Sequence, residues 1–192
     1  MILALLLFGT QQSPPIHELL SPELAVERMS KCGLGRPVAR YDRESKIEIL
    51  VLRRPVRARD DQLACLDKAS GYLDVRLSLA LQWRFNAIRD ARLKAYFRDK
   101  GRAWLEAHGL LERLPEYRPG NGAAYVQAIE QLCGPEASGA FRATDGGYGF
   151  SPEWMKRNEG HQFADEPTTC LTYALMASGF PPGFVGNESA AP

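Results

Sequence analysis

The sequence predicts an α+β fold, in which a small three-stranded sheet (a hairpin plus one strand) packs against a predominantly helical layer. Capped segments with apolar residues at helical spacing alternate, in the first half of the chain, with short runs typical of strands. The apolar and charged fractions, 45% and 24%, are those of an ordinary globular domain. The length of 192 residues fits one domain. We place that domain at residues 16–187, between a leader at 1–15 and a disordered tail at 188–192.

The first helix begins after Ser21, because Ser is a good N-cap and the next residue, Pro22, fits the first helical position. It ends near Gly33, since glycine readily takes the left-handed conformation that closes a helix. Residues 38–41 and 47–52 are rich in strand-forming side chains, and a short polar loop joins them. This pattern predicts a hairpin.

A second helix, a third strand and a long helix are expected next. Asp60 is placed as the cap of the second helix. Residues 72–79 alternate between apolar and polar side chains, which is typical of a half-buried strand. The long helix is predicted over 82–108, with Gly109 after it, and most of its apolar side chains fall within an arc of about 120°.

The second half of the chain is predicted to be helical apart from one long loop. A helix is expected at 123–133, and the Gly-rich stretch 134–149 has the composition of a loop. Ser151 begins a short helix by the same Ser-Pro-Glu pattern that follows Ser21. The last helix is expected from about Asp165 to Gly179.

An uninterrupted apolar run at residues 1–8 suggests export. It is too short to span a bilayer, which takes about 20 residues, but it has the length of a signal-peptide core. No basic residue precedes the run and no clear cleavage site follows it. We predict a periplasmic or secreted protein that is not integral to the membrane once processed. The alternative is a buried N-terminal strand or helix in a cytoplasmic protein.

Four cysteines agree with export. They are Cys32, Cys65, Cys133 and Cys170. The absence of any Cys-x-x-Cys pair argues against a zinc ribbon or a thioredoxin-type site. Two cysteines precede Gly and two precede Leu, so the simplest of three pairings joins Cys32 to Cys65 and Cys133 to Cys170. Each bridge would add roughly 3 to 4 kcal/mol in the chain-entropy model. In the cytosol, four buried reduced thiols would be the better interpretation.

Several stretches of the sequence are similar to segments found in a known group of proteins. They are residues 61–69, 84–92, 103–105 with 109–111, 132–135 and 151–154. In these stretches the chain resembles a group of uncharacterised exported proteins from Gram-negative bacteria, over about residues 30–187. The resemblance implies export and one domain. Because the group has no assigned activity, it implies no catalytic residue.

His161, Asp165 and Glu166 are the one place where a histidine and carboxylates cluster in the sequence. On a helix, His161 and Asp165 would share a face and could act as a general base or hold one edge of a metal site. The simpler interpretation is that the two acids form the cap and first turn of the last helix. No nucleophile elbow or phosphate-binding glycine loop is present. We therefore expect no metal and no cofactor.

Three aromatic residues near a Gly-rich turn are candidates for ligand binding. Tyr148, Phe150 and Trp154 could line a loop for a sugar or a peptide, because such loops often carry function on a rigid scaffold. The alternative is that they pack beneath a turn that the glycines permit.

Basic residues on the long helix are a second binding candidate. By helical periodicity, Arg84, Arg98 and Arg102 lie close together around the helix, and such a ridge could meet phosphates or an acidic partner. Acidic residues at i,i+4 positions favour a solvated face instead. The net charge of +1 gives no argument for nucleic acid, which we do not expect as a partner.

These observations favour an exported, non-catalytic envelope domain that binds a protein or a small ligand. The first alternative is a small envelope hydrolase that uses His161 with Asp165 and Glu166. The second is a cytosolic protein with buried reduced thiols.

Overall fold

The computed structural model describes residues 20–53, 57–144, 147–158 and 167–180. The chain divides into two compact units, Met1–Ala91 and Arg92–Pro192, and the boundary falls within the longest helix, α3 (Leu79–Ala107). Each unit has its own hydrophobic core. The leader at 1–15 and the tail at 188–192 lie outside the described residues. The single domain over 16–187 stays a prediction.

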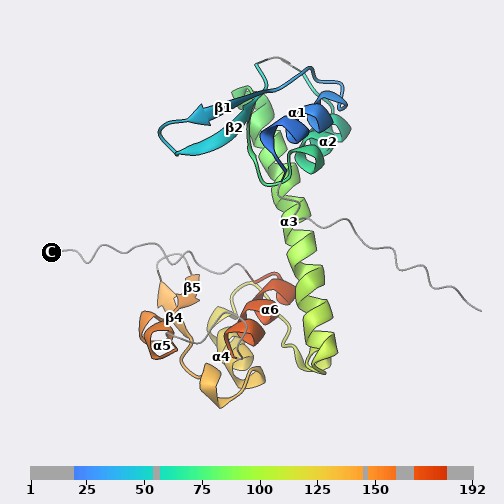
Figure 1. Ribbon diagram of the computed structural model, residues 1–192. Coiled ribbons are helices and arrows are strands. Elements are labelled where there is room, and N and C mark those ends of the chain that lie inside the picture. The colour runs from blue at the N-terminus through green and yellow to red at the C-terminus, as the bar shows by residue number, and fades with distance from the viewer. Residues whose placement is uncertain (1–19, 54–56, 145–146, 159–166, 181–192) are drawn as a thin grey trace, which may run out of the picture. The chain divides into compact units, whose positions relative to one another are not determined.

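The first unit contains two short helices, a sheet and the start of α3 (Figure 1). Its elements are α1 (Pro22–Ser30), β1 (Val38–Asp42), β2 (Ile47–Val51), α2 (Asp60–Ser70) and β3 (Asp74–Arg76). The hairpin β1–β2 is antiparallel, with Val38 opposite Val51, and β3 joins β2 in parallel, with Asp74 opposite Ile49. The α+β class and the sheet of a hairpin plus one strand are thus confirmed.

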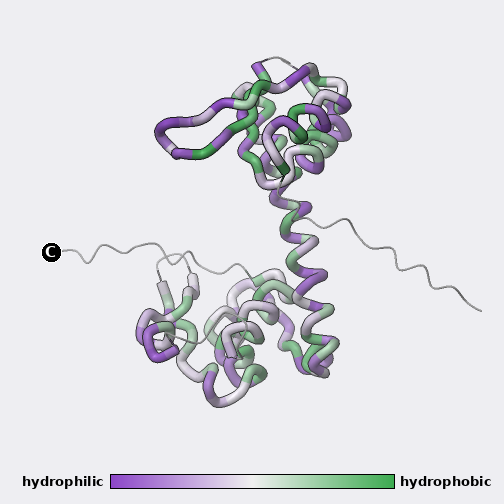
Figure 2. The backbone as a smooth tube through the Cα atoms, in the orientation of Figure 1, coloured by the Kyte–Doolittle hydropathy of each residue, from purple (hydrophilic) through white to green (hydrophobic). Residues whose placement is uncertain are grey.

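The core of the first unit lies between the sheet and its helices. Leu50 and Val75 face it from neighbouring strands. The helices supply buried residues of their own: Ala25, Met29, Leu63, Leu66 and Phe85. In Figure 2 the tip of the hairpin is hydrophilic, whereas hydrophobic residues gather in the helices beside the sheet. Ile49 and Leu50, consecutive residues of β2, are both buried, so the sheet is covered on both faces at this point.

The third strand is shorter than the sequence pattern predicts, because β3 ends at Arg76 and α3 already begins at Leu79. The side chain of Gln82 explains the early end. Its Oε1 accepts a hydrogen bond from the Leu77 N–H at 2.8 Å, and its Nε2 donates to the Val75 carbonyl at 3.0 Å. This amide takes the place of a further strand and closes the outer edge of β3.

The second unit contains the rest of α3, several helices and a small hairpin (Figure 1). Its elements are η1 (Leu111–Arg113), α4 (Gly122–Leu132), η2 (Pro135–Ala137), β4 (Phe141–Thr144), β5 (Gly147–Phe150), α5 (Pro152–Arg157) and α6 (Thr168–Ser178). The loop predicted over 134–149 is wrong in its second part, since β4 and β5 pair there as antiparallel strands. Two of the glycines that suggested a loop, Gly147 and Gly149, lie in β5 itself, where Gly149 is opposite Arg142.

Close approach of α3 and α6 shapes the second core. A Cβ at Gly101 would lie 2.5 Å from the Tyr173 carbonyl oxygen and 2.7 Å from the Ala177 nitrogen. Only a glycine lets these two backbones come so near. Beside this crossing, the ring of Trp104 stacks on that of Tyr173, with centroids 5.2 Å apart.

Both predicted disulfides are present, one in each unit. Cys32–Cys65 joins the end of α1 to α2, and Cys133–Cys170 joins the end of α4 to α6. The Cα atoms of each pair are 5.7 Å apart, in the usual range. The simplest pairing is therefore confirmed, and no cysteine is free.

The two Ser-Pro-Glu caps are also confirmed. The Ser21 hydroxyl accepts a hydrogen bond from the Leu24 N–H, and the Ser151 hydroxyl accepts one from the Trp154 N–H, each at 3.3 Å. Within the described part of the chain, no helix is both long enough and apolar enough to cross a membrane.

Candidate interaction surface

The histidine and carboxylate cluster predicted as a catalytic candidate, His161 with Asp165 and Glu166, lies outside the described residues. Among the residues that the structure does describe, no group of three or more His, Cys, Asp or Glu side chains could hold a metal ion. The hydrolase alternative stays a prediction.

The three aromatic candidates pack within the second unit. Trp154 is buried, and its indole N–H donates to the Glu136 carbonyl at 2.9 Å. Phe150 stacks on Trp154, with ring centroids 6.0 Å apart. The ring of Tyr148 lies against Gly122, where an added Cβ would come within 2.9 Å of it. This arrangement fits the interpretation that the aromatics pack beneath the turn, and a role in binding stays a prediction.

The basic candidates on α3 are exposed. Arg84 forms an ion pair with Asp60 of α2, and both side chains remain open to solvent. Arg98 and Arg102 are exposed as well. A binding role for these three arginines stays a prediction.

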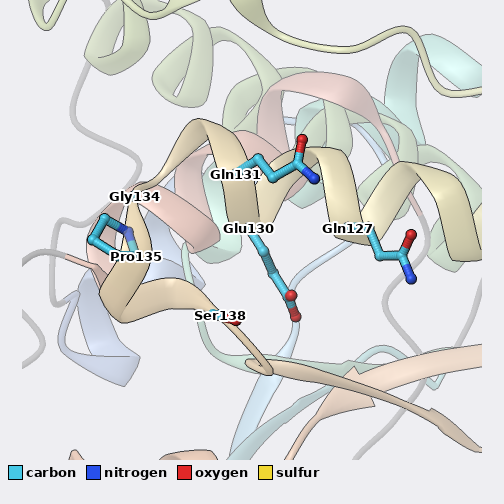
Figure 3. Close-up of a pocket in the computed structure, with 6 residues that line it drawn as sticks. All are labelled: Gln127, Glu130, Gln131, Gly134, Pro135 and Ser138. Atoms are coloured by element: carbon cyan, nitrogen blue, oxygen red, sulfur yellow. The ribbon is translucent and has the colours of Figure 1, made fainter.

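A groove along α4 forms a pocket of about 570 Å³ in the second unit (Figure 3). Its main polar group is Glu130, flanked by Gln127 and Gln131. Both oxygens of Glu130 are already used, because they accept hydrogen bonds from the Gly139 and Phe141 N–H groups at 3.1 and 2.9 Å. The carboxylate therefore holds the chain that leads into β4, which makes the groove a weak ligand site.

A second pocket, of about 530 Å³, lies in the first unit between β3 and the beginning of α3. It has an apolar side and a polar side. Its lining residues are Asp74, Val75, Arg76, Leu77, Leu79, Gln82, Asn86 and Arg89.

The polar side of this pocket is held in place by the unit's own hydrogen bonds. Besides its two bonds to β3, Gln82 donates to the Asn86 Oδ1 at 3.0 Å. Arg76 donates to the Asp42 carboxylate at 2.6 Å. The hydrogen bond from Ser45 and the nearby Arg76 guanidinium hold the pKa of Asp42 below its ordinary value. The wall is therefore preorganised before anything binds.

The floor of the pocket rests on a buried ion pair. Asp67 of α2 is only 1% exposed, and its Oδ1 accepts from the Arg89 Nε at 3.0 Å. Arg89 also donates to the Ser70 hydroxyl at 2.8 Å, and its guanidinium lies over the Phe85 ring. This network ties α2 and the turn after it to α3.

Two large apolar side chains near the start of α3 are exposed. Leu79 is 78% and Trp83 is 74% exposed, the highest values among the large hydrophobic residues that the structure describes. They are four residues apart on α3, so they are neighbours on the helix surface. Leu79 itself lines the pocket. We call Leu79, Trp83 and this pocket together the Trp83 surface.

This surface was not predicted from the sequence. Leu79 was expected at the end of a strand, and Trp83 lies outside the arc of apolar residues predicted for the long helix. A usable signal was present, because Leu81 and Phe85 form the buried i,i+4 pair of α3 and leave Leu79 and Trp83 on a different side. A tryptophan off the buried face of a helix indicates an exposed apolar patch.

Comparison of the chain with protein-family models, with curated proteins and with solved structures finds no match.

Proposed function

We propose that this protein is an exported, non-catalytic binding protein whose partner docks on the Trp83 surface. The observation that carries the proposal is the 74% exposure of Trp83, which lies four residues after Leu79, a residue that lines the pocket. Exposed apolar patches mark interaction sites, and tryptophan is among the residues that most often dominate the binding energy of an interface.

Export is supported by the two disulfides, because such bonds persist in oxidising compartments. The apolar run at the N-terminus and the resemblance to exported proteins of Gram-negative bacteria point the same way. The polar groups of the pocket favour binding over catalysis, since they are engaged in the hydrogen bonds and ion pairs that hold the first unit together.

Site-specific photo-crosslinking in a bacterial host that exports the protein tests the binding role. A benzophenone amino acid replaces Trp83 in one variant and Tyr41 in the control, which is an exposed aromatic residue on β1 of the same unit. We expect covalent adducts from position 83 and none from position 41. Equal or absent adducts at the two positions would contradict the proposal.

Intact mass measurement tests export. The chain is expressed with its own N-terminus, and its mass is measured before and after reduction. We expect a mass that lacks the leader and a gain of two hydrogens for each of the two disulfides on reduction. A full-length mass that reduction does not change would favour the cytosolic alternative.

A further inference from the structure

We infer that the Cys133–Cys170 disulfide is a redox-sensitive bond that exchanges with a dithiol reductant, whereas the Cys32–Cys65 disulfide resists the same reductant. This inference goes beyond the proposed binding role and does not depend on it, because it concerns only how the fold presents the two sulfur atoms of each disulfide.

Exchange at a disulfide makes a different demand on each of its two sulfur atoms. A thiolate from the reductant must reach one sulfur, and the other sulfur must then leave as a thiolate. The exchange is therefore fastest where the sulfur that is easier to reach is bonded to a sulfur that leaves easily. The two disulfides of this chain differ on this point.

In each disulfide, one cysteine is easier to reach than the other. Cys32 is 6% exposed and Cys170 is 2% exposed, so both are buried. Their partners, Cys65 and Cys133, are partly exposed. An attacking thiolate therefore meets Cys65 in the first unit, where the sulfur of Cys32 has to leave. In the second unit it meets Cys133, and the sulfur of Cys170 has to leave.

The fold makes Cys170 a good leaving group. It is the third residue of α6, which begins at Thr168. The Leu171 N–H donates to the Pro167 carbonyl at 3.0 Å, and the N–H groups before Leu171 have no partner within the helix. These N–H groups and the positive end of the helix dipole stabilise a thiolate in the first turn of a helix.

Cys32 lies at the opposite kind of helix end. It follows α1, which ends at Ser30, and its Sγ is 4.0 Å from the carbonyl oxygen of Arg28 in the last turn of that helix. A thiolate at this place would face carbonyl oxygens and the negative end of the helix dipole. The adjacent cation, Lys31, is already paired with Glu27 at 2.9 Å. Cys32 is therefore a poor leaving group.

Access and leaving ability thus agree in the second unit and conflict in the first. The reachable Cys133 is at the C-terminal cap of α4, and its sulfur is bonded to the one at the start of α6. The reachable Cys65 is in the middle of α2, and its sulfur is bonded to that of Cys32. Burial opposes the charge of both leaving thiolates, so it does not reverse this order.

Reduction of the second disulfide takes two steps. One thiolate of the dithiol attacks the Cys133 Sγ and forms a mixed disulfide, while the Cys133–Cys170 bond breaks and Cys170 leaves as a thiolate. The second thiolate of the dithiol then attacks the dithiol's own sulfur in the mixed disulfide, and Cys133 leaves as a thiolate. The dithiol is oxidised to a disulfide, and the protein takes up its two electrons and two protons.

The product is a half-reduced chain. In this chain, the end of α4 is no longer bonded to α6, whereas Cys32–Cys65 still closes the first unit. The redox state of the surroundings would therefore act on the second unit before the first.

Partial reduction of the folded full chain tests the inference. The oxidised protein is treated with dithiothreitol at neutral pH, samples are quenched with an alkylating reagent, and peptide mass mapping shows which cysteines are labelled. We expect the Cys133–Cys170 pair to be labelled roughly tenfold faster than the Cys32–Cys65 pair. The control is the same chain unfolded in guanidinium chloride. There the two pairs, 33 and 37 residues apart, should be reduced at similar rates.

A monothiol tests the direction of attack. Glutathione can form the mixed disulfide with either cysteine of a pair. We expect the glutathione adduct on Cys133 of the folded chain and a free, alkylatable thiol at Cys170. The reverse assignment would contradict the role of burial.

Thr168→Asp tests the effect of the start of α6. Residue 168 is the first residue of this helix, so a carboxylate there opposes negative charge on Cys170. The matched control is Thr168→Asn, which has nearly the same shape without the charge. We expect Cys133–Cys170 to be reduced about threefold more slowly in Thr168→Asp than in Thr168→Asn, with no difference at Cys32–Cys65. Equal rates at Cys133–Cys170 would contradict the role of the helix end.

The inference is overturned if the two disulfides of the folded chain are reduced at similar rates, if Cys32–Cys65 is reduced first, or if neither is reduced before the chain unfolds. The same preference in the unfolded chain also overturns it, because the order would then come from the local sequence and not from the fold.

Discussion

The two units of this protein have similar elements, but they bury different kinds of side chain. Each unit has helices, a small sheet and one disulfide, but the first buries a charged pair, Asp67 with Arg89, beneath its pocket. The second unit instead packs aromatic rings, with Tyr117, Tyr125 and Phe180 within about 5 Å of each other. The first unit therefore adds a buried ion pair to its apolar core, whereas the core of the second unit is rich in packed aromatic rings.

The difference extends to the surface. The most exposed apolar residues that the structure describes, Leu79 and Trp83, belong to the first unit. The aromatic residues proposed from sequence as a binding loop pack together in the second unit. The proposed interaction surface lies beside this polar network, since Gln82 and Arg89 of the network line its pocket.

The largest expected effect comes from breaking the buried ion pair. Arg89→Met keeps much of the apolar stem but removes the guanidinium that faces Asp67 and lies over the Phe85 ring, so we expect a loss of about 3–5 kcal/mol in the free energy of unfolding. Urea denaturation of the full chain measures it.

The control for this change is Arg84→Met, which removes an exposed ion pair with Asp60 and should cost much less. Adding Asp67→Asn to Arg89→Met should recover part of the lost stability, because Asp67→Asn removes the buried negative charge that Arg89→Met leaves unpaired. Equal losses for Arg84→Met and Arg89→Met would show that the polar network does not stabilise the first unit.

A smaller effect is expected from the close approach in the second unit. Gly101→Ala gains helix propensity, yet the new methyl group would meet the backbone of α6 at Tyr173 and Ala177. We expect a net loss of about 1–3 kcal/mol, as for overpacked cores. Thermal unfolding of the full chain measures this.

Gly122→Ala is the comparison for Gly101→Ala, because its added methyl group would meet the Tyr148 ring rather than backbone and a side chain can shift. If Gly101→Ala were neutral or stabilising, the close approach of α3 and α6 would not require a glycine at position 101.

The smallest effect concerns the buried phenol of Tyr125. No hydrogen-bond partner with good geometry satisfies its hydroxyl, although the Ser178 hydroxyl lies nearby, and burial raises the pKa of this phenol. The unfolded chain ionises Tyr125 near its usual pKa of about 10, while the folded chain keeps the proton. The unfolded state then binds fewer protons, so this residue makes stability fall as the pH rises above about 10.

Tyr125→Phe should therefore change stability little at pH 7 and should reduce the loss of stability above pH 10. Urea denaturation at pH 7 and at several values above pH 9.5 measures the difference. Parallel pH profiles for wild type and variant would contradict the role of burial at this ring.

Local chemistry made much of the fold predictable. The Ser21 and Ser151 caps, the hairpin and the disulfide pairing depend on residues close in sequence or on repeated contexts, so pattern was enough to predict them. The hairpin β4–β5 was missed because glycines weaken the strand signal. The third strand was predicted too long because the bonds that end it come from the side chain of Gln82, which no local pattern indicates.

By itself, the sequence determined the α+β class, the caps and the cysteine pairing. These follow from backbone preferences and from the small number of pairings that four cysteines allow. Only the tertiary structure decided which side of α3 is buried, which charges pair and where the apolar surface lies. Arg89 and Asp67 are 22 residues apart, and nothing in their local context links them. Burial depends on which elements meet in space, so the spacing of Leu81 and Phe85 can indicate a side for Leu79 and Trp83, but only the folded chain shows how exposed they are.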